Sequence, residues 1–277
     1  MYGTAATTMA VRGKRIALAN RYVNRLGTDG TSGGMELRGP NVYISADKDN
    51  DIELGQGSPL ASALSPDGKT LYLTGYIYAR ITRATQDIAK LSDPRSIPVV
   101  MKVDMDGKGG QASVFAGQTS ILKAGTGVGE LKVPSCVAVD DQGRVYVGDY
   151  INDRIQVFDP AGKLLKSIAA YRPARIVIHP KSGELYVFSW WVRNQYEDEG
   201  VRRVLTQYGP FDDPKKLRQW EYASQSKFQI SWGATIPVEF TADIDFHCQP
   251  AKVWLAEPWT GANVMNEGRI AHTGITI

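Results

Sequence analysis

The stretch VYVGDYINDRIQVFDPAGKLLKSI, at residues 145–168, decides the fold. Branched and aromatic residues alternate with polar ones along it, as in a half-buried strand, and the tetrapeptide DPAG at 159–162 is typical of a tight turn. No segment of it has the 3.6-residue apolar period of a helix. The stretch therefore predicts antiparallel strands that are joined by short turns.

The same pattern is repeated along the chain. An apolar strand, a polar turn and a second strand recur in five copies, at residues 8–22, 60–76, 136–150, 175–190 and 243–258. A recurring four-stranded sheet that cannot cover its own two faces is typical of a propeller blade. We therefore expect an all-β fold, a β-propeller of four-stranded antiparallel blades.

The expected blades lie in a single domain over residues 1–277. They cover roughly 6–45, 59–117, 133–168, 172–225 and 239–277. These are five recognisable repeats, and a six-bladed ring stays open, because divergent insertions or a longer chain could supply another blade. Helical turns are expected only at 85–91 and 213–220, where the apolar period fits a helix.

The third copy resembles the NHL repeat. The residues that carry the resemblance lie between 134 and 162: Pro134, VAVD at 137–140, Gly143, VYV at 145–147, Asp149, Asn152, RI at 154–155, Asp159 and Gly162. The resemblance extends over 133–168 and also covers 6–29 and 59–83. It implies a β-propeller but no particular function, because propellers host lyases, lactonases and protein or RNA binders on one frame.

Composition restricts the classes of function. The chain has 277 residues, of which 43% are hydrophobic and 22% charged, as in a soluble globular protein with a core. The net charge of +3 and the lack of a Lys/Arg-rich run argue against nucleic acid as a partner. No apolar run reaches the roughly 18 residues of a membrane helix. No signal peptide is recognisable, so we expect a cytoplasmic protein or a mature or excised segment of an exported one.

The two cysteines, Cys136 and Cys248, are too few for a disulfide scaffold. They lie on or just after the first strands of the third and fifth repeats. Another blade separates these repeats, whereas a disulfide needs Cα atoms within roughly 7 Å. We therefore expect two free thiols.

Charged residues interrupt the first strands of the last two repeats. When the five first strands are aligned on their last apolar residue, Arg175 and Asp243 are equivalent, and Asp245 lies on the same face. We expect Arg175 and Asp243 to meet. Two interpretations stay open, an ion pair between blades and a polar cluster that binds a ligand.

Tryptophans and histidines supply further candidates. Trp190 and Trp191 precede a charged insertion, where one of them could stack on a ligand or partner while the other packs inside. His179 and His247 follow the first strands of consecutive repeats, as turn caps or as weak candidates for metal ligands. Asp47, Asp49 and Asp51 have the spacing of a calcium loop. The loop lacks the glycine and the final acid of that motif, so a solvated loop is favoured.

These observations favour a non-catalytic propeller that binds a protein partner or a polar small ligand, as one domain of a larger assembly or alone. Arg175, Asp243, Asp245, Trp190 and Trp191 are the expected binding residues, and no cofactor is expected. The alternative is a propeller enzyme of the lyase or lactonase type, which would hold Ca or Zn on the axis. Such an enzyme needs several inward-facing carboxylate, Asn or His side chains, whereas the aligned first strands carry mostly small or apolar residues.

Overall fold

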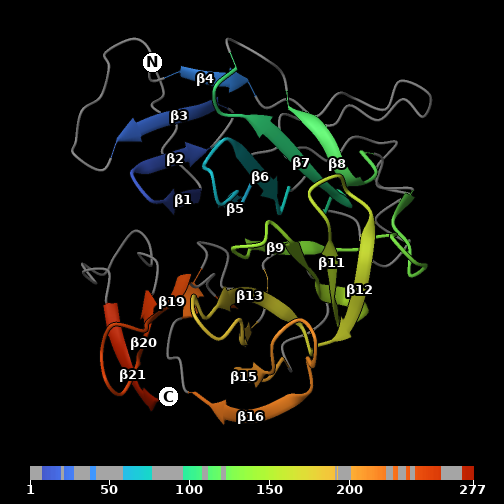
Figure 1. Cartoon of the computed structure of the whole chain (residues 1–277). Coiled ribbons are helices and arrows are strands. Elements are labelled where there is room, and N and C mark those ends of the chain that lie inside the picture. Colours follow the sequence, from blue (N-terminus) through green and yellow to red (C-terminus); the bar gives the residue numbers. More distant parts are fainter. Residues whose placement is uncertain are drawn as a thin grey trace. The chain divides into compact units, whose positions relative to one another are not determined.

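The computed structural model is nearly all β-structure where it describes the chain (Figure 1). The described residues are 8–19, 22–27, 38–41, 59–76, 96–107, 112–119, 123–190, 192, 201–222, 227–229, 235–237, 241–256 and 270–277. They belong to two compact units, Met1–Ala169 and Ala170–Ile277. In the part of the chain that is described, no helix has the length and hydropathy of a membrane span.

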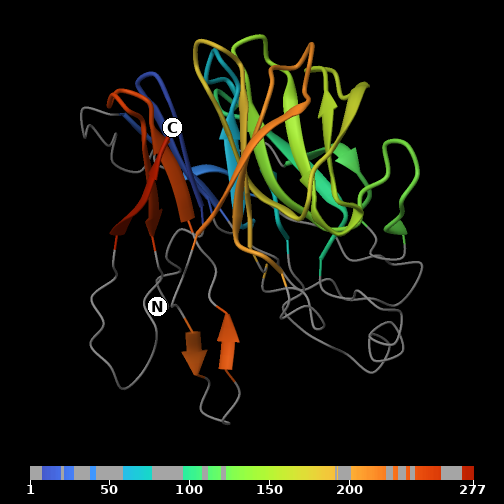
Figure 2. The same cartoon turned by 90° about the horizontal axis from the view of Figure 1, so that it is seen from below.

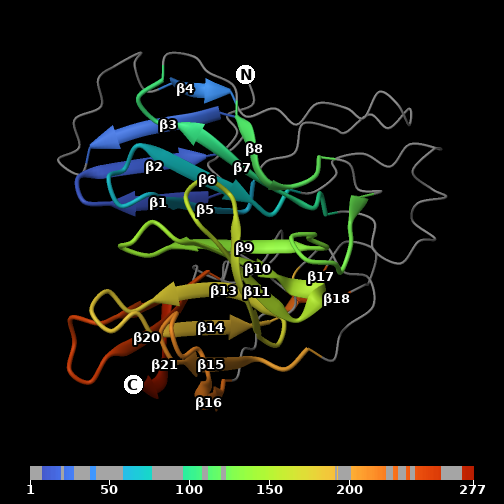
Figure 3. The ribbon, with the colours of Figure 1, turned by 45° about the vertical axis from the view of Figure 1, so that its right-hand side comes forward.

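The first unit holds three antiparallel sheets of four strands each. Their strands are β1 (Thr8–Arg12), β2 (Arg15–Ala19), β3 (Tyr22–Gly27) and β4 (Arg38–Asn41); β5 (Ala61–Leu64), β6 (Thr70–Thr74), β7 (Val99–Asp104) and β8 (Ser113–Gly117); and β9 (Pro134–Val139), β10 (Val145–Asp149), β11 (Arg154–Phe158) and β12 (Leu164–Ala169). In each sheet the strands lie in sequence order. The first strands pack side by side, β1 against β5 and β5 against β9, so the sheets follow one another as layers (Figures 2 and 3).

The second unit holds a four-stranded sheet, a three-stranded sheet and a short hairpin. Their strands are β13 (Pro173–Ile178), β14 (Leu185–Ser189), β15 (Val204–Tyr208) and β16 (Lys216–Glu221); β19 (Thr241–Asp245), β20 (Lys252–Ala256) and β21 (Ile270–Thr276); and β17 (Lys227–Gln229) with β18 (Thr235–Pro237). The first strands β13 and β19 contact each other, as β1, β5 and β9 do in the first unit.

The core explains why the second strand of a repeat lacks an alternation of apolar and polar residues. All five residues of β10 and all five of β14 are buried. A strand that is covered on both faces of its sheet has no solvent side, so apolar residues need not alternate with polar ones. Stacking of the sheets therefore selects runs such as VYVGD and LYVFS.

The predicted all-β propeller is confirmed. Four repeats form sheets of four antiparallel strands, and the fifth has three strands among the described residues. The single-domain organisation over 1–277 stays a prediction. The expected thiol state is also confirmed, because neither Cys136 nor Cys248 forms a disulfide.

One local prediction is wrong. Residues 213–220 were expected to form a helical turn, but most of them lie in β16, which pairs with β15 along its length. Backbone hydrogen bonds to β15, with Leu205 opposite Trp220, outweigh the weak helical period of this segment. The other expected turn, at 85–91, lies outside the described residues.

Candidate functional site

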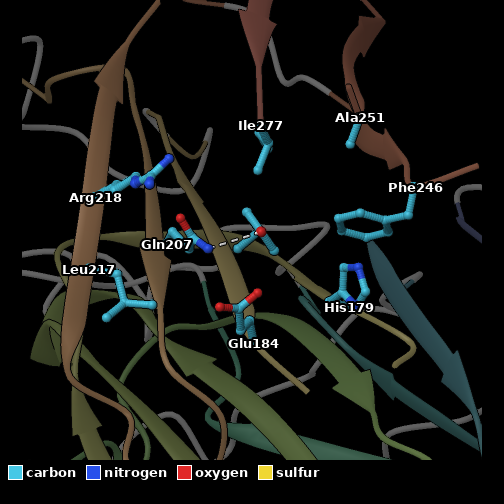
Figure 4. Close-up of a pocket in the computed structure, with 9 residues that line it drawn as sticks. His179, Glu184, Gln207, Leu217, Arg218, Phe246, Ala251 and Ile277 are labelled. Atoms are coloured by element: carbon cyan, nitrogen blue, oxygen red, sulfur yellow. Dashed lines mark hydrogen bonds between the residues drawn. The ribbon is translucent and has the colours of Figure 1, made fainter. Parts of the chain in front are cut away.

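The second unit contains a cavity of about 520 Å³ (Figure 4). It lies where the sheet of β13–β16 meets the turn after β19. Its polar lining comes from His179, Glu184, Tyr186, Gln207 and Arg218. Its apolar lining comes from Leu217, Phe246, Ala251 and Ile277.

Three of the polar side chains form a row across the sheet. Tyr186 in β14 is the register partner of Gln207 in β15, and Gln207 is the register partner of Arg218 in β16. Register partners on neighbouring strands point to the same face of a sheet, so the three side chains reach one cavity from three strands. We call Tyr186, Gln207 and Arg218 the polar row.

The middle of the polar row is neutral and hydrogen-bonded. The side-chain amide of Gln207 donates to the hydroxyl oxygen of Tyr186 at 3.1 Å, the contact marked by the dashed line in Figure 4. Burial, together with the negative charge of Glu184, raises the pKa of Tyr186 to about 12, while Arg218 opposes the shift. A side-chain hydrogen bond with Glu184 contributes to the shift, so the Tyr186 hydroxyl keeps its proton at neutral pH and directs it toward that carboxylate.

Two rings form the opposite side of the cavity. Phe246 lies edge-to-face against His179, with ring centroids 4.5 Å apart, and tilted against Tyr186 at 5.4 Å. The Nδ1 atom of His179 accepts backbone N–H groups from Lys181 at 3.1 Å and Ser182 at 3.0 Å. An accepting Nδ1 leaves the proton of the neutral ring on Nε2, so His179 closes its turn and presents a donor on its other edge.

The equivalent turn of the third repeat is closed by an acid. Asp140 follows β9 as His179 follows β13, and its Oδ1 accepts the backbone N–H groups of Gln142 at 3.0 Å and Arg144 at 2.9 Å. Its Oδ2 pairs with the Arg144 guanidinium at 2.5 Å and accepts the Tyr146 hydroxyl at 3.0 Å. The turn-cap interpretation of His179 is thus supported by its contacts and by the neighbouring repeat.

A second polar cluster, in the first unit, holds a loop in place. Asp149 is fully buried and accepts the backbone N–H of Lys132 at 2.8 Å and the Asn152 side-chain amide at 2.7 Å. It also pairs with the guanidinium of Arg154 at 2.8 Å. These motif residues of the NHL-like repeat therefore satisfy one another.

Arg154 extends that cluster to the loop before β9. Its terminal nitrogens donate to the carbonyl oxygens of Thr126 and Gly127 at 2.9 Å each and of Glu130 at 2.8 Å. A guanidinium has five N–H donors in a fixed plane, so one side chain can hold several carbonyls at once. The cluster is structural, because its donors and acceptors are used within the fold.

The predicted contact between Arg175 and Asp243 does not form among the described side chains. The Nε atom of Arg175 is buried without a hydrogen-bond partner, whereas Asp243 is exposed and accepts the backbone N–H of Ile244 at 2.8 Å. The alignment behind the prediction was shifted by one residue, because Asp245 ends β19 opposite Lys252 as Ile178 ends β13 opposite Leu185.

This shift changes which residues are equivalent. Phe246 does not end a strand but takes the turn position of His179, and the equivalent of Arg175 is the buried Ala242. A slip of one residue along a strand exchanges its two faces. Arg175 and Asp243 therefore stay separate candidates for binding rather than a pair.

Asp245 closes the turn after β19. Its Oδ1 accepts the backbone N–H of His247 at 2.9 Å, and its Oδ2 accepts the Cys248 thiol at 3.1 Å. The hydrogen bond from Cys248, followed by that from His247, lowers the pKa of Asp245. The same contact with Asp245 raises the pKa of the Cys248 thiol.

The remaining predicted residues have different places. Trp190 is 4% exposed and packs against Phe188, so its ring belongs to the packed interior. Trp191 lies outside the described residues, as does the acidic loop at 47–51. His247 is exposed, and in the described ranges no group of three or more His, Cys, Asp or Glu side chains could hold a metal ion.

Sequence reasoning did not select Glu184 or the polar row. Tyr186 carried a signal, because each of the three best repeats has a tyrosine there, at positions 72, 146 and 186. No sequence pattern pointed to Gln207 or Arg218. The ladder between β15 and β16 is irregular between Gln207 and Tyr208, so which β16 residue faces the cavity depends on the register.

A comparison with protein-family models matches more than half of the sequence. The family model described as the SMP-30/Gluconolactonase/LRE-like region matches residues 25–190. No curated protein matches the sequence.

Several solved structures are similar to the chain at low identity. Hydrazine synthase from Kuenenia stuttgartiensis is 15% identical, with 98% of this chain and 68% of that chain covered and a TM-score of 0.49. A chain of the nidogen/laminin complex is 17% identical, with 88% and 70% covered and a TM-score of 0.49. A gluconolactonase from Xanthomonas campestris is 19% identical, with 62% and 42% covered and a TM-score of 0.38.

Proposed function

The chain belongs to the SMP-30/gluconolactonase/LRE-like family, and we propose that it acts as a non-catalytic propeller module that binds a small polar ligand. The observation that carries this proposal is the cavity of the second unit, where a few polar side chains face apolar walls. Its volume of about 520 Å³ lies within the range of small-molecule sites, which is roughly 300–1,000 Å³.

The polar groups of the cavity suit a ligand rather than the fold. Gln207 and Tyr186 satisfy each other, but no hydrogen bond or ion pair engages Arg218 anywhere in the described part of the chain. An arginine presents several donors in a planar arrangement that matches carboxylate or phosphate oxygens. Arg218 therefore offers the anchor and the rings of Phe246 and His179 offer a wall for the body of the ligand.

Arg175 is a second candidate within the same proposal. A buried N–H without an acceptor destabilises a protein by about 1–3 kcal/mol, which an incoming acceptor would relieve. The Nε atom of Arg175 is in this state. Asp243, Asp245, Trp190 and Trp191 stay predictions as binding residues, and a protein partner stays the other kind of ligand that the repeat architecture would suit.

The family also supports an alternative, a lactonase-type enzyme that holds Ca or Zn on the propeller axis. The family description includes gluconolactonase. The described residues do not provide a group of three ligating His, Cys, Asp or Glu side chains. The lactone-hydrolysis assay described below distinguishes this alternative from the proposal.

The experiment is a ligand screen with the full chain and one variant. Thermal unfolding is measured with amino acids, sugars, sugar acids and phosphorylated metabolites, because a ligand at 100 times its Kd stabilises the native state by about 2.7 kcal/mol. We expect at least one polar compound to raise the Tm of the wild type and to have no effect on the Tm of Arg218→Gln. A screen without hits, or hits that Arg218→Gln retains in full, would refute the cavity as the binding site.

The enzyme alternative is tested on the same preparation. Hydrolysis of sugar lactones is followed with and without added Ca or Zn, alongside a metal analysis of the purified protein. Turnover that depends on a stoichiometric metal ion would contradict the non-catalytic proposal.

A further inference from the structure

Two opposite charges line the cavity without neutralising each other. In the described part of the chain no ion pair joins Glu184 to Arg218, and Figure 4 shows their side chains entering from different sides of Gln207. Oε2 of Glu184 accepts the Ser182 hydroxyl at 2.9 Å, and hydroxyl donation leaves the carboxylate charge in place. Arg218 lies at the exposed edge strand. The cavity thus offers a negative site and a positive site, separated by the neutral part of the polar row.

The third repeat shows that the fold does not require this arrangement. At the equivalent turn, Arg144 stands where Glu184 stands, and it is neutralised by Asp140 at 2.5 Å. In the fourth repeat the position of Asp140 holds His179, which closes the turn through Nδ1 as a neutral acceptor. The turn therefore lacks the ion pair of the third repeat: it contains Lys181, but among the described residues no ion pair joins Lys181 to Glu184, whose Oε2 accepts the Ser182 hydroxyl instead.

The polar row differs from its counterparts in the same way. The row of the third repeat consists of Tyr146, Val157 and Lys166, and that of the second repeat consists of Tyr72, Lys102 and Ser113. All three rows share the tyrosine, which packs in the sheet. The combination of a neutral amide with a terminal guanidinium belongs to the fourth repeat, next to its unpaired carboxylate.

From these contacts we infer that the cavity recognises a small zwitterion with an apolar body, such as a free α-amino acid with an aromatic or aliphatic side chain. The inference rests on the proposed function and specifies its ligand class. The carboxylate of the ligand pairs with Arg218, its ammonium group pairs with Glu184, and its body lies against Phe246. The Gln207 side chain hydrogen-bonds to the polar end of the ligand, while the Tyr186 hydroxyl holds Gln207 in place.

Ligands with a single charge fit the cavity less well. A simple anion gains the contact with Arg218 but is repelled by Glu184. A simple cation gains the contact with Glu184 but is repelled by Arg218. Both charges line one cavity, so each acts on every ligand in it, and because Arg218 is exposed the effect should weaken as the salt concentration rises. A zwitterion is attracted by both sites and is repelled by neither.

The test uses four probes that differ in charge, and isothermal titration calorimetry with the full chain. The probes are L-phenylalanine, which is zwitterionic; L-phenylalaninamide, a cation; 3-phenylpropanoate, an anion; and gluconate, a polyhydroxylated anion. We expect L-phenylalanine to bind at least about tenfold more tightly than each of the other three, since each loses one of two charge-assisted contacts.

Three variants assign the contacts. Arg218→Gln should weaken the binding of L-phenylalanine and 3-phenylpropanoate by about tenfold and leave that of L-phenylalaninamide unchanged or improved. Glu184→Gln should weaken L-phenylalanine and L-phenylalaninamide and leave 3-phenylpropanoate unchanged or improved. Lys215→Gln is the matched control, because it removes an exposed cation three residues from Arg218 that does not line the cavity. It should bind all four probes as the wild type does.

The outcomes separate this inference from the proposed function. If gluconate or 3-phenylpropanoate binds as tightly as L-phenylalanine and Glu184→Gln has no effect, the site recognises anions; the zwitterion inference is then wrong while the binding proposal stands. If no probe binds at millimolar concentration, the inference is also wrong, and the wider ligand screen decides the binding proposal by itself. Arg218 is exposed and Glu184 is half-buried, so equal Tm values of variants and wild type are expected and verify that folding is intact.

Discussion

Replacing Asp149 by alanine should lower the free energy of unfolding by about 3–5 kcal/mol, which is typical when one partner of a buried ion pair is removed. The Asp149 carboxylate is fully buried, and the side chain of Arg154 is only 17% exposed. The variant leaves the guanidinium without its counter-charge, and it leaves the Lys132 N–H and the Asn152 amide without their acceptor. Because a domain is stable by only about 5–15 kcal/mol, the effect should be large.

The assay is equilibrium urea unfolding followed by circular dichroism, with hydrogen exchange as a local readout. The urea midpoint should fall, and the slope of the transition should stay similar, because the same surface is exposed on unfolding. Amide protons of the loop at 125–132 should exchange faster, since Arg154 holds the carbonyl oxygens of this loop. The effect should therefore be both global and concentrated at one loop.

The matched control is Asp141→Ala. Asp141 pairs with Arg12, but its side chain is 58% exposed, so the loss should be below about 1 kcal/mol. Equal losses for the two variants, or a loss below about 1.5 kcal/mol for Asp149→Ala, would refute the argument that burial makes this carboxylate important.

Three further predictions concern the second unit. His179→Ala should lower the free energy of unfolding by about 1 kcal/mol, because two backbone N–H groups lose their acceptor, while His179→Asp should stay near wild type in the same urea assay. Asp245→Asn should speed alkylation of Cys248 by iodoacetamide at neutral pH, measured by mass spectrometry, because the carboxylate raises the pKa of the thiol; an unchanged rate contradicts this. Burial raises the pKa of Tyr186 from 10.0 to about 12, so its contribution to stability is complete below pH 10 and is lost as the pH rises to about 12. Urea midpoints across this pH window should fall less steeply for Tyr186→Phe than for the wild type.

The fold was predictable because its signals are local and repeated. Alternation in 145–168 and glycine turns such as the one at Gly143, where φ is +80°, specify a hairpin without reference to the rest of the chain. The recurrence of this hairpin then specifies the stacking of blades. The prediction of a helical turn at 213–220 was wrong because this edge strand is stabilised by pairing with β15 and not by its own sequence pattern.

The cavity was not predictable, because it depends on register between distant strands. Glu184 precedes β14 and Arg218 lies in β16, and neither residue belongs to a recognisable motif. The predicted contact between Arg175 and Asp243 was wrong for the same reason, since a shift of one residue in β19 moves an acidic side chain to the other face of the sheet. A repeat can thus be recognised in a single sequence. To know which face of the sheet each side chain occupies, one also needs the register in which the strands pair.

Different residue types close the turn after the first strand in different repeats. Asp140 and His179 accept backbone N–H groups at the same place, so the backbone is held in the same way whether the closing group is an acid or an imidazole. At these two turns the charge of the closing residue can therefore change without a change in the backbone hydrogen bonds that hold the hairpin. A hairpin of the same backbone geometry can therefore carry an acid or an imidazole at this position, so repeats that share a fold can differ in the chemistry that their turns present to solvent.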